Sequence, residues 1–381
     1  MRTRSLALVV TAATSALVLA ACGSSSSSGS SSSAAASSEA PASSSAPAES
    51  SSAPAGPGKV GVILPDSASS ARWETADRKY LSEAFAAAGV EADIQNAGGD
   101  KAKFGTLCDG MISSGVSVLM IVNLDSDTGA ACSKKAQAQG IKVIDYDRLT
   151  LGGGAAVYVS FDNVAVGTAM GEGLVKCLKD NGVSAGTVAL LNGSPTDNNA
   201  TLFKQGYEAA IKAAGFTIGE DQSVPDWDNT KAGQIFEQMY AKDPNIVGVN
   251  AANDGLGGAA IAVLAKNGQA GKILVTGQDA TDEGLTRVLE GTQCVTVYKA
   301  IKKEADAAAA AAIALANGQE PETNGVTKDS TSGTDVPSVL LVPQAIFADT
   351  VKEVVADGFT TAAKICTTEA AKAACAKFGV S

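Results

Sequence analysis

The chain has 381 residues, which is enough for two or three domains of ordinary size. Its 29 Lys and Arg against 40 Asp and Glu give a net charge of −11, so neither nucleic acid nor an anionic membrane surface would attract it. It contains no histidine, which excludes Ser-His-Asp catalysis, histidine general bases and every zinc site that needs a histidine ligand.

The first residues have the features of a signal peptide. Arg2 and Arg4 precede an apolar stretch at 6–20 that is too short to span a bilayer, which takes about 20 residues. The stretch ends in Leu-Ala-Ala-Cys-Gly at 19–23, which resembles a bacterial lipobox. We therefore expect a lipoprotein signal peptide at 1–21 and a lipid on Cys22, which would anchor the protein to the outer face of the cell membrane.

Residues 22–58 are almost wholly Ser, Ala, Pro and Gly after the cysteine. Such a composition cannot bury enough apolar surface to fold, so we expect a disordered tether. A flexible chain of this length reaches roughly 30–36 Å.

From Lys59 onward, short β-branched runs alternate with Ala-rich runs of helical periodicity, which indicates parallel sheets with helices on both faces. The first series has strands at 60–64, 116–122, 142–145 and 157–159, with helices at 73–88, 101–114 and 127–139. The second has strands at 187–191, 246–250, 273–276 and 295–298, with helices at 163–180, 199–214, 230–242 and 255–267. A further helix is expected at 300–316.

The two series resemble copies of one unit. Ala-Phe-Ala-Ala-Ala-Gly-Val at 84–90 parallels Ala-Ile-Lys-Ala-Ala-Gly-Phe at 210–216. We therefore predict an α/β fold of two doubly wound lobes. In such sheets ligands bind beyond the carboxyl ends of the strands, so the two sets of strand ends would face each other across a cleft that closes by hinge motion.

Polar side chains and the only two tryptophans follow the predicted strands. Carboxylate, amide and guanidinium groups offer paired coplanar hydrogen-bonding sites, which suit the adjacent hydroxyls of a sugar, and an indole can pack on the C–H face of its ring. The candidate ligand-binding residues are Arg72, Trp73, Asp147, Arg148, Asn198, Asn199, Trp227, Asn253, Asp254, Gln278, Asp279 and Lys299.

Each candidate also has a purely structural interpretation. Asp197, Asp254 and Asp279 taken singly fit helix caps better than ligands, and Arg148 fits an ion pair with Asp147. A tryptophan in a loop often covers the edge of a core. The recurrence of these residues at equivalent ends of two similar halves favours a binding site.

Eight motifs in order closely resemble the xylose-binding branch of the type 1 periplasmic sugar-binding proteins, over residues 59–358. They are Ala-Arg-Trp at 71–73, Tyr-Asp-Arg at 146–148, Phe-Asp-Asn at 161–163, Gly-Ser-Pro-Thr-Asp-Asn-Asn-Ala at 193–200, Asn-Asp at 253–254, Gly-Gln-Asp-Ala at 277–280, Val-Tyr-Lys at 297–299 and Asp-Val-Pro-Ser at 335–338. The resemblance implies a monomeric substrate-binding lipoprotein that delivers an aldopyranose, most simply D-xylose, to an ABC import permease. Ala71 stands where the closest xylose binders carry an acidic residue, which leaves a broader aldose preference open.

The resemblance also implies how the residues are used. Seven side chains would hydrogen-bond the pyranose, with Trp73 and Trp227 against its faces; these seven are Arg72, Asp147, Arg148, Asn199, Asn253, Asp279 and Lys299. It implies three hinge crossings, near 160–163, 296–300 and 326–334. The first lobe would then be 59–161 plus 300–327, and the second 162–299 plus 328–360, followed by a tail at 361–381.

Six cysteines remain after Cys22, an even number in a chain expected to be exported, which favours three disulfides. Cys366 and Cys375 form the easiest pair, and Cys108 and Cys132 lie in neighbouring predicted helices. Cys177 with Cys294 follows only by elimination. A Cys₄ metal site is the rival interpretation, but no C-x-x-C motif is present.

Three functions compete on the sequence alone. The preferred one is a receptor that presents its closed form to a permease, and the second is a sensory module that presents it to a receptor or sensor kinase. The third is an exported glycoside hydrolase in which Asp147 and Asp279 are the carboxylate pair. Each of these carboxylates lies beside side chains with paired hydrogen-bonding groups, which would keep it ionised. Neither carboxyl therefore fits a general acid. No nucleotide, calcium or other cofactor motif is complete, and we expect no cofactor or metal.

Overall fold

The computed structural model describes residues 58–381, which belong to one unit of the fold. The predicted signal peptide at 1–21, Cys22 and the tether at 22–58, except for its last residue, lie outside the described residues. No helix within 58–381 combines the length and apolar content that a membrane crossing requires.

The first lobe is built on a seven-stranded sheet. Its order is β11-β12-β5-β4-β3-β1-β2, and every neighbouring pair is parallel except β11 with β12. The strands are β1 (Val60–Leu64), β2 (Ala92–Asn96), β3 (Val118–Ile121), β4 (Lys142–Tyr146), β5 (Val157–Phe161), β11 (Gly325–Lys328) and β12 (Asp335–Leu341).

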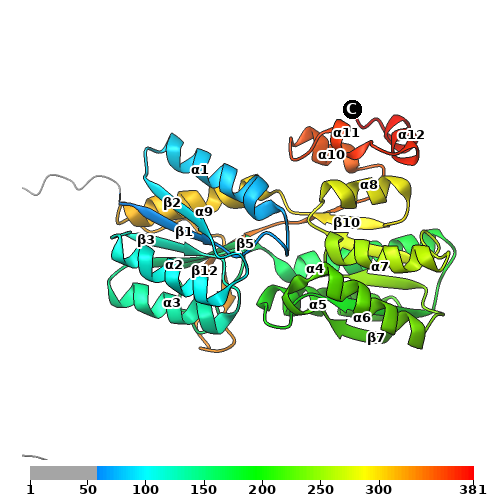
Figure 1. The fold of residues 1–381 in the computed structure, drawn as a ribbon, viewed down its shortest axis with the longest axis horizontal. Helices are drawn as coiled ribbons and strands as arrows, with labels where there is room; N and C mark the ends of the chain where they lie inside the picture. Colours follow the sequence, from blue (N-terminus) through cyan, green and yellow to red (C-terminus); the bar gives the residue numbers. More distant parts are fainter. Residues whose placement is uncertain (1–57) are drawn as a thin grey trace, which may run out of the picture. The chain divides into compact units, whose positions relative to one another are not determined.

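Helices cover both faces of this sheet (Figure 1). Val60, Val62 and Leu64 of β1 pack toward α1 (Arg78–Ala87) and α9 (Ile301–Ala316). Ile63 packs on the other face with α2 (Lys101–Ser113) and α3 (Ser126–Ala138). Because side chains alternate along a strand, a continuous apolar run with both faces buried is typical of a parallel sheet between helical layers.

The second lobe holds a six-stranded sheet of order β13-β10-β9-β8-β6-β7, parallel except for β13. The strands are β6 (Thr187–Asn192), β7 (Thr217–Ser223), β8 (Gly248–Ala251), β9 (Leu274–Gln278), β10 (Val295–Tyr298) and β13 (Gln344–Ile346). The helices are α4 (Asn163–Asp180), α5 (Asn198–Ala213), α6 (Asn229–Lys242), α7 (Asp254–Lys266) and α8 (Asp282–Glu290). The predicted α/β fold of two doubly wound lobes is confirmed.

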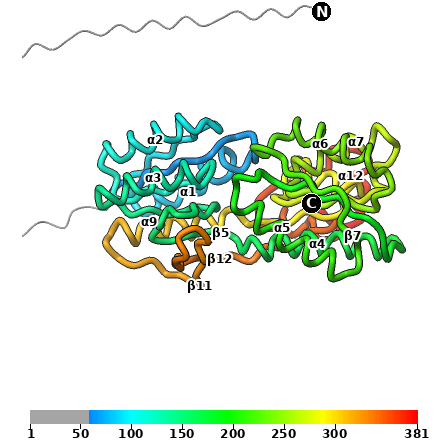
Figure 2. Tube along the Cα trace, turned by 90° about the horizontal axis from the view of Figure 1, so that it is seen from below, coloured from blue at the N-terminus to red at the C-terminus, as the bar shows by residue number. Residues whose placement is uncertain are grey.

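Three crossings connect the lobes, and one of them differs from the expectation. The chain crosses between β5 and α4, between β10 and α9, and between β12 and β13. The third crossing therefore lies at 342–343 and not at 326–334, and the segment 328–341, expected in the second lobe, belongs to the first. Figure 2 shows β11 and β12 beside α9 and β5. The segment where the resemblance implied a crossing is instead the turn of a hairpin, in which the Asp329 carboxylate accepts the backbone N–H groups of Thr331 and Ser332.

The sequence patterns did not reveal the edge strands β2 and β7, because half-exposed or polar residues make up most of both. They also did not reveal the C-terminal helices α10 (Val351–Ala356), α11 (Ala362–Ile365) and α12 (Glu369–Phe378). The expected tail at 361–381 is folded: α11 and α12 lie against α8 of the second lobe, where Ile365 and Ala371 join one apolar cluster with Leu285.

Three disulfides join the six cysteines of the described residues. Cys108 is bonded to Cys132 and Cys366 to Cys375, and Cys177 is bonded to Cys294. The last of these ties α4 to the start of β10, the elements that flank two of the three crossings.

Candidate functional site

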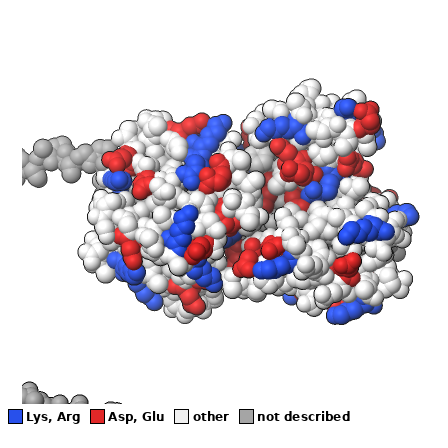
Figure 3. All heavy atoms as spheres, viewed as in Figure 1, with Lys and Arg blue, Asp and Glu red and all other residues white. Residues whose placement is uncertain are grey.

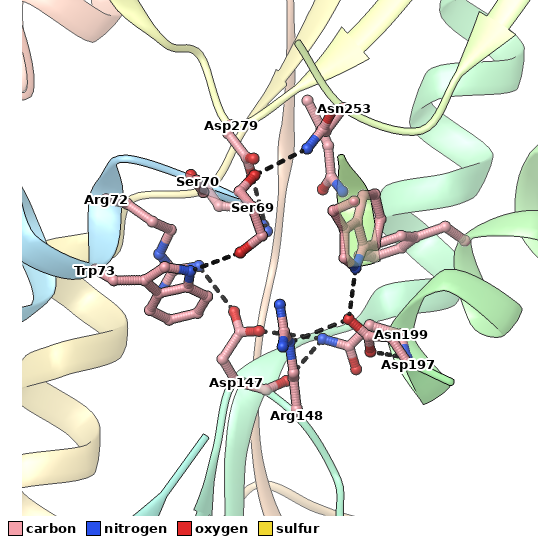
Figure 4. Close-up of a pocket in the computed structure, with 14 residues that line it drawn as sticks. Ser69, Ser70, Arg72, Trp73, Asp147, Arg148, Asp197, Asn199, Asn253 and Asp279 are labelled. Carbon is pink, nitrogen blue, oxygen red and sulfur yellow. Dashed lines mark hydrogen bonds and ion pairs between the residues drawn. The ribbon is translucent and has the colours of Figure 1, made fainter. Parts of the chain in front are cut away.

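A cavity lies where the carboxyl ends of the two sheets meet. On the face seen in Figure 3 the molecule is hollowed between the lobes, with acidic side chains in and beside the hollow. Figure 4 shows the lining side chains pointing inward from both lobes. The lining residues are Ser69, Ser70, Arg72, Trp73, Asp147, Arg148, Asp197, Asn199, Phe203, Trp227, Asn253, Gln278, Asp279 and Lys299.

All the candidate residues except Asn198 and Asp254 line this cavity. Asn198 is the first residue of α5 and lies outside the cavity, and the residue before it, Asp197, caps this helix. Ser69, Ser70 and Phe203 were not singled out from the sequence, and no sequence signal distinguished them. Asp197 was interpreted as a cap, and it both caps α5 and lines the cavity.

Asp254 is a structural residue behind the site. Its buried carboxylate accepts the Thr281 backbone N–H at 2.9 Å, the Gln293 amide at 2.7 Å and the Thr296 hydroxyl at 2.9 Å. It therefore joins the start of α7 to α8 and β10. Burial raises the pKa of Asp254 to about 6.

Arg72 is surrounded by carboxyl groups. Its Nε and Nη2 atoms donate to the two Asp77 carboxylate oxygens at 2.9 and 2.8 Å, and Nη1 donates to Asp147 at 2.8 Å. Nη2 also donates to Glu304 at 2.6 Å. A guanidinium has five N–H groups, so these bonds leave one, on Nη1, for a ligand. Burial opposes its charge, but the three carboxyls raise the pKa of Arg72 well above its usual value.

Asp147 follows β4 in the left-handed region, with φ of 61°, a conformation that turns its side chain into the cleft. The Asn199 amide from the second lobe donates to its carboxylate at 3.2 Å and to its backbone oxygen at 2.9 Å. Although burial opposes ionisation, the cations Arg72, Lys299 and Arg148 lower the pKa of Asp147, so it is a carboxylate at neutral pH.

An ion pair links the lobes at the other side of the cavity. The Arg148 Nε atom of the first lobe lies 3.1 Å from Asp197 Oδ2 of the second, and the Trp227 indole N–H donates to the same oxygen at 3.1 Å. The Asp197 carboxylate also accepts the Asn199 backbone N–H at 2.9 Å. The Asp197 carboxylate therefore positions the Arg148 guanidinium, the Trp227 indole and the first turn of α5.

Asp279 and Lys299 form a second ion pair, with Lys299 Nζ 3.0 Å from Asp279 Oδ1. Asp279 follows β9 with φ of 91°, and Lys299 follows β10. Burial opposes the charge of the lysine, but Asp279 and Asp147 outweigh it and raise the pKa of Lys299. The ammonium therefore stays charged at neutral pH.

The two indoles line the cavity from different lobes, Trp73 from the first and Trp227 from the second. Trp73 is 2 % exposed, and its indole N–H donates to the Ser69 hydroxyl at 3.2 Å. The guanidinium carbon of Arg72 lies 4.4 Å from the centroid of the Trp73 ring. Trp227 meets Phe203 edge to face at 6.5 Å. A Cβ on Gly193 would come within 2.1 Å of the Trp227 ring, so only glycine leaves room for this indole.

Several buried polar atoms of the site have no hydrogen-bond partner among the described residues. They are Ser70 Oγ, Gln278 Oε1 and Asp279 Oδ1. Asp279 Oδ1 is within ion-pair distance of Lys299, but the angle is poor for a hydrogen bond. Buried polar atoms are almost always hydrogen-bonded, so these three identify where a polar ligand would be held.

Comparisons with known proteins agree with this architecture. A family model described as a periplasmic binding protein domain matches residues 60–320. The D-xylose-binding periplasmic protein of Escherichia coli (strain K12) is 34% identical over 307 residues, which cover 79% of this chain and 90% of that protein. The multiple sugar-binding periplasmic receptor ChvE of Rhizobium radiobacter is 31% identical over 325 residues, covering 79% and 90%.

A solved structure is similar over the same region. The carbohydrate transporter solute binding protein of Chloroflexus aurantiacus, in complex with D-glucose, is 26% identical with a TM-score of 0.71. The alignment covers 80% of this chain and 97% of that one. All three relatives are named as binding proteins, receptors or transporter components and none as an enzyme.

The hydrogen bonds of Asp254 predict that its substitution lowers the stability of the fold. Asp254→Asn replaces one accepting oxygen with a donor, which leaves buried donors of Thr281 or of Gln293 and Thr296 without an acceptor. We expect a loss of about 2–4 kcal/mol in the free energy of unfolding, measured by denaturant titration. Asn198→Ala, at the half-exposed neighbour of a helix cap, should change it by less than about 0.5 kcal/mol. Equal stabilities of the two variants would contradict the structural role of Asp254.

Proposed function

The chain belongs to the type 1 periplasmic sugar-binding protein family, and from that premise we propose that it holds an aldopyranose, D-xylose first, in the cavity between its lobes. The family consists of binding proteins, and the protein is a binder and not an enzyme. The proposal adds to this the class of sugar, the residues that hold it and the delivery of the sugar to an ABC permease.

The observation that carries the proposal is a set of buried atoms in the lining of the cavity: Ser70 Oγ and Gln278 Oε1 have no hydrogen-bond partner among the described residues, and Asp279 Oδ1 has only its ion pair with Lys299. Each unsatisfied buried polar group costs about 1–3 kcal/mol, so a ligand that bonds them gains that free energy. A sugar hydroxyl can donate one hydrogen bond and accept others at the same time. It can therefore donate to the Asp279 carboxylate while it accepts from a neighbouring N–H group. The ring's C–H faces would pack against Trp73 and Trp227.

The ionised groups of the cavity suit a neutral ligand. Arg148 is paired with Asp197, Lys299 with Asp279, and Arg72 with carboxyls on three sides. A charged ligand would have to displace one of these ion pairs, whereas a hydroxyl can bond to the remaining donor and acceptor positions. Asp147 and Asp279 would accept from sugar hydroxyls, and Arg72 Nη1, Arg148 and Asn253 would donate to them.

Contacts between the lobes support a closing motion. Besides the Arg148–Asp197 ion pair, the Asn253 amide of the second lobe donates to the Ser69 backbone oxygen of the first at 3.3 Å. A sugar bonded to both lobes would add to these contacts and favour the closed arrangement, since a ligand shifts an equilibrium by its differential affinity for the two states. The closed form is the one we propose is presented to the permease.

Calorimetric titration with D-xylose, D-glucose, D-galactose, L-arabinose and D-ribose tests the proposal. We expect micromolar or tighter binding of D-xylose, with a change in tryptophan fluorescence, because both indoles line the cavity. Because Ala71 stands where the closest xylose binders carry an acidic residue, we expect a second of these aldoses to bind within about tenfold of D-xylose. No heat and no fluorescence change with any of the five sugars would contradict the proposal.

Substitutions test the map of the site. Trp73→Ala, Trp227→Ala and Arg148→Ala should each weaken sugar binding by more than about 1 kcal/mol, because each removes a stacking surface or a charged hydrogen bond. Asn198→Ala is the matched control: it lies next to Asn199 on α5, outside the cavity, and should bind as the unchanged protein does. The map would be wrong if the three variants and the control bound the sugar equally well.

Membrane anchoring through Cys22 is part of the same proposal and rests on the Leu-Ala-Ala-Cys-Gly motif at 19–23. Cys22→Ser removes the thiol that would carry the lipid. We expect this variant to move from the membrane fraction to the soluble fraction of the producing cells, while its affinity for sugar stays unchanged. Retention of the variant in the membrane fraction would contradict lipid anchoring at this residue.

A further inference from the structure

A further carboxyl, Glu304, lies directly behind the side chains that face the cavity. It belongs to the first turn of α9, the helix that begins after the second crossing, and it is 0 % exposed. Glu304 Oε2 accepts from Arg72 Nη2 at 2.6 Å, and Glu304 Oε1 has no hydrogen-bond partner among the described residues. Glu304 does not line the cavity, so it would act on a ligand only through the side chains that do, Arg72 first among them.

The charges around Arg72 do not balance if every carboxyl is ionised. Asp77 takes two of the guanidinium's N–H groups, and Asp147 takes another at 2.8 Å. Lys299, the other cation that faces Glu304, is paired with Asp279. When buried carboxyls crowd around one cation, their mutual repulsion raises the pKa of one of them and so favours its keeping a proton.

Glu304 is the carboxyl that the surroundings favour for that proton. The charged groups on the exposed side of α9 do not face Glu304. On that side Lys302 pairs with Asp306 and lies near Tyr80 and Glu83 of the neighbouring helix α1, and Lys79 contacts the same Tyr80 ring. The groups that face Glu304 from the other packed elements are Arg72, Asp77, Tyr146, Asp147, Tyr158 and Lys299. Tyr146 donates its hydroxyl to Asp77 and so stabilises that carboxylate instead. Burial raises the pKa of Glu304 to about 8. The positive charges of Arg72 and Lys299 oppose this rise, and the negative charges of Asp147 and Asp77 add to it.

We propose that Glu304 is a positioning residue of the sugar site that works as a neutral carboxylic acid, holding Arg72 in place while the guanidinium charge stays with Asp77 and Asp147. This inference rests on the proposed sugar-binding function. Once Glu304 loses its proton, its carboxylate competes with Asp147 for Arg72 and repels Asp147. The Asp147 carboxylate and the last free N–H of Arg72 then lose their alignment toward the ligand.

Sugar affinity should therefore depend on pH through Glu304. We expect D-xylose to bind with constant affinity from pH 6 to 7 and several-fold more weakly at pH 9.5. Arg72 and Lys299 do not explain such a loss, because their raised pKa values keep both charged over this range. Glu304→Gln keeps the shape and the acceptor but cannot ionise, so it should bind as the unchanged protein does at pH 6.5 and show no loss at pH 9.5.

The control is Asp306→Asn, two residues along the same helix on its exposed side, which should keep the pH dependence of the unchanged protein. Glu304→Ala, which removes the contact with Arg72, should bind weakly at every pH. The proposal is overturned if Glu304→Gln loses tenfold or more in affinity at pH 6.5, or if it retains the alkaline loss.

A measurement without sugar separates this inference from the proposed function. The folded protein would hold a proton on Glu304 that the unfolded chain, with a pKa near 4.5, gives up. The stability of the unchanged protein relative to Glu304→Gln should then fall as pH rises from about 4.5 to about 8, and level off above that. A difference in melting temperature that is constant over this range would overturn the neutral state of Glu304. If that difference varies as expected and no sugar binds at any pH, the proposed function fails and the protonation of Glu304 stands.

Discussion

The arrangement of the site depends on the sharing of Arg72 among three carboxyl groups. Asp77 comes from the turn that carries the arginine, Asp147 from the end of β4 and Glu304 from α9, so one buried cation ties together three separate segments of the first lobe. Removing any one carboxyl would leave a buried charge less well paired, which is costly in a medium of low dielectric constant. This network holds Asp147 at the cleft, and the Arg72 guanidinium carbon in turn lies 4.4 Å from the centroid of the Trp73 ring.

The second lobe supplies the complementary half. Asp197 holds Arg148 and Trp227, and Asp279 holds Lys299, so the functional side chains of both lobes are oriented by ion pairs before a ligand arrives. The atoms without partners, Gln278 Oε1 among them, are then the positions at which we propose that a sugar hydroxyl completes the hydrogen bonding. Preorganised polar groups with few free positions select a ligand by the pattern of its hydroxyls, because a sugar that misplaces one leaves a buried group unsatisfied.

Much of this arrangement was predictable from sequence, because strand ends and helix starts are marked by residues with distinct physical roles. Buried β-branched runs located β1 and β10 at the residues where the structure has them, and the polar residues that follow the strands included most of the cavity lining. The direction of a side chain at a helix start was not predictable: Asn253 and Asp254 are adjacent, yet only Asn253 faces the cleft. Glu304 gave no signal because its role depends on a contact with Arg72, 232 residues away in the chain. The resemblance implied a crossing near 326–334, where the structure has the hairpin of β11 and β12, and neither strand was predicted from the sequence.

The central claim is that a pyranose lies between Trp73 and Trp227, bonded to Asp147 and Asp279. A crystal structure of the protein with D-xylose, or with whichever of the five sugars binds best, tests it most directly. The account predicts a sugar ring between the two indoles, hydroxyls within hydrogen-bond distance of Asp147, Asp279 and Gln278 Oε1, and the Arg72 contacts with Asp77 and Glu304 kept. A sugar bound elsewhere, or one in the cleft that leaves Gln278 Oε1 and Asp279 without hydroxyl partners, would contradict it.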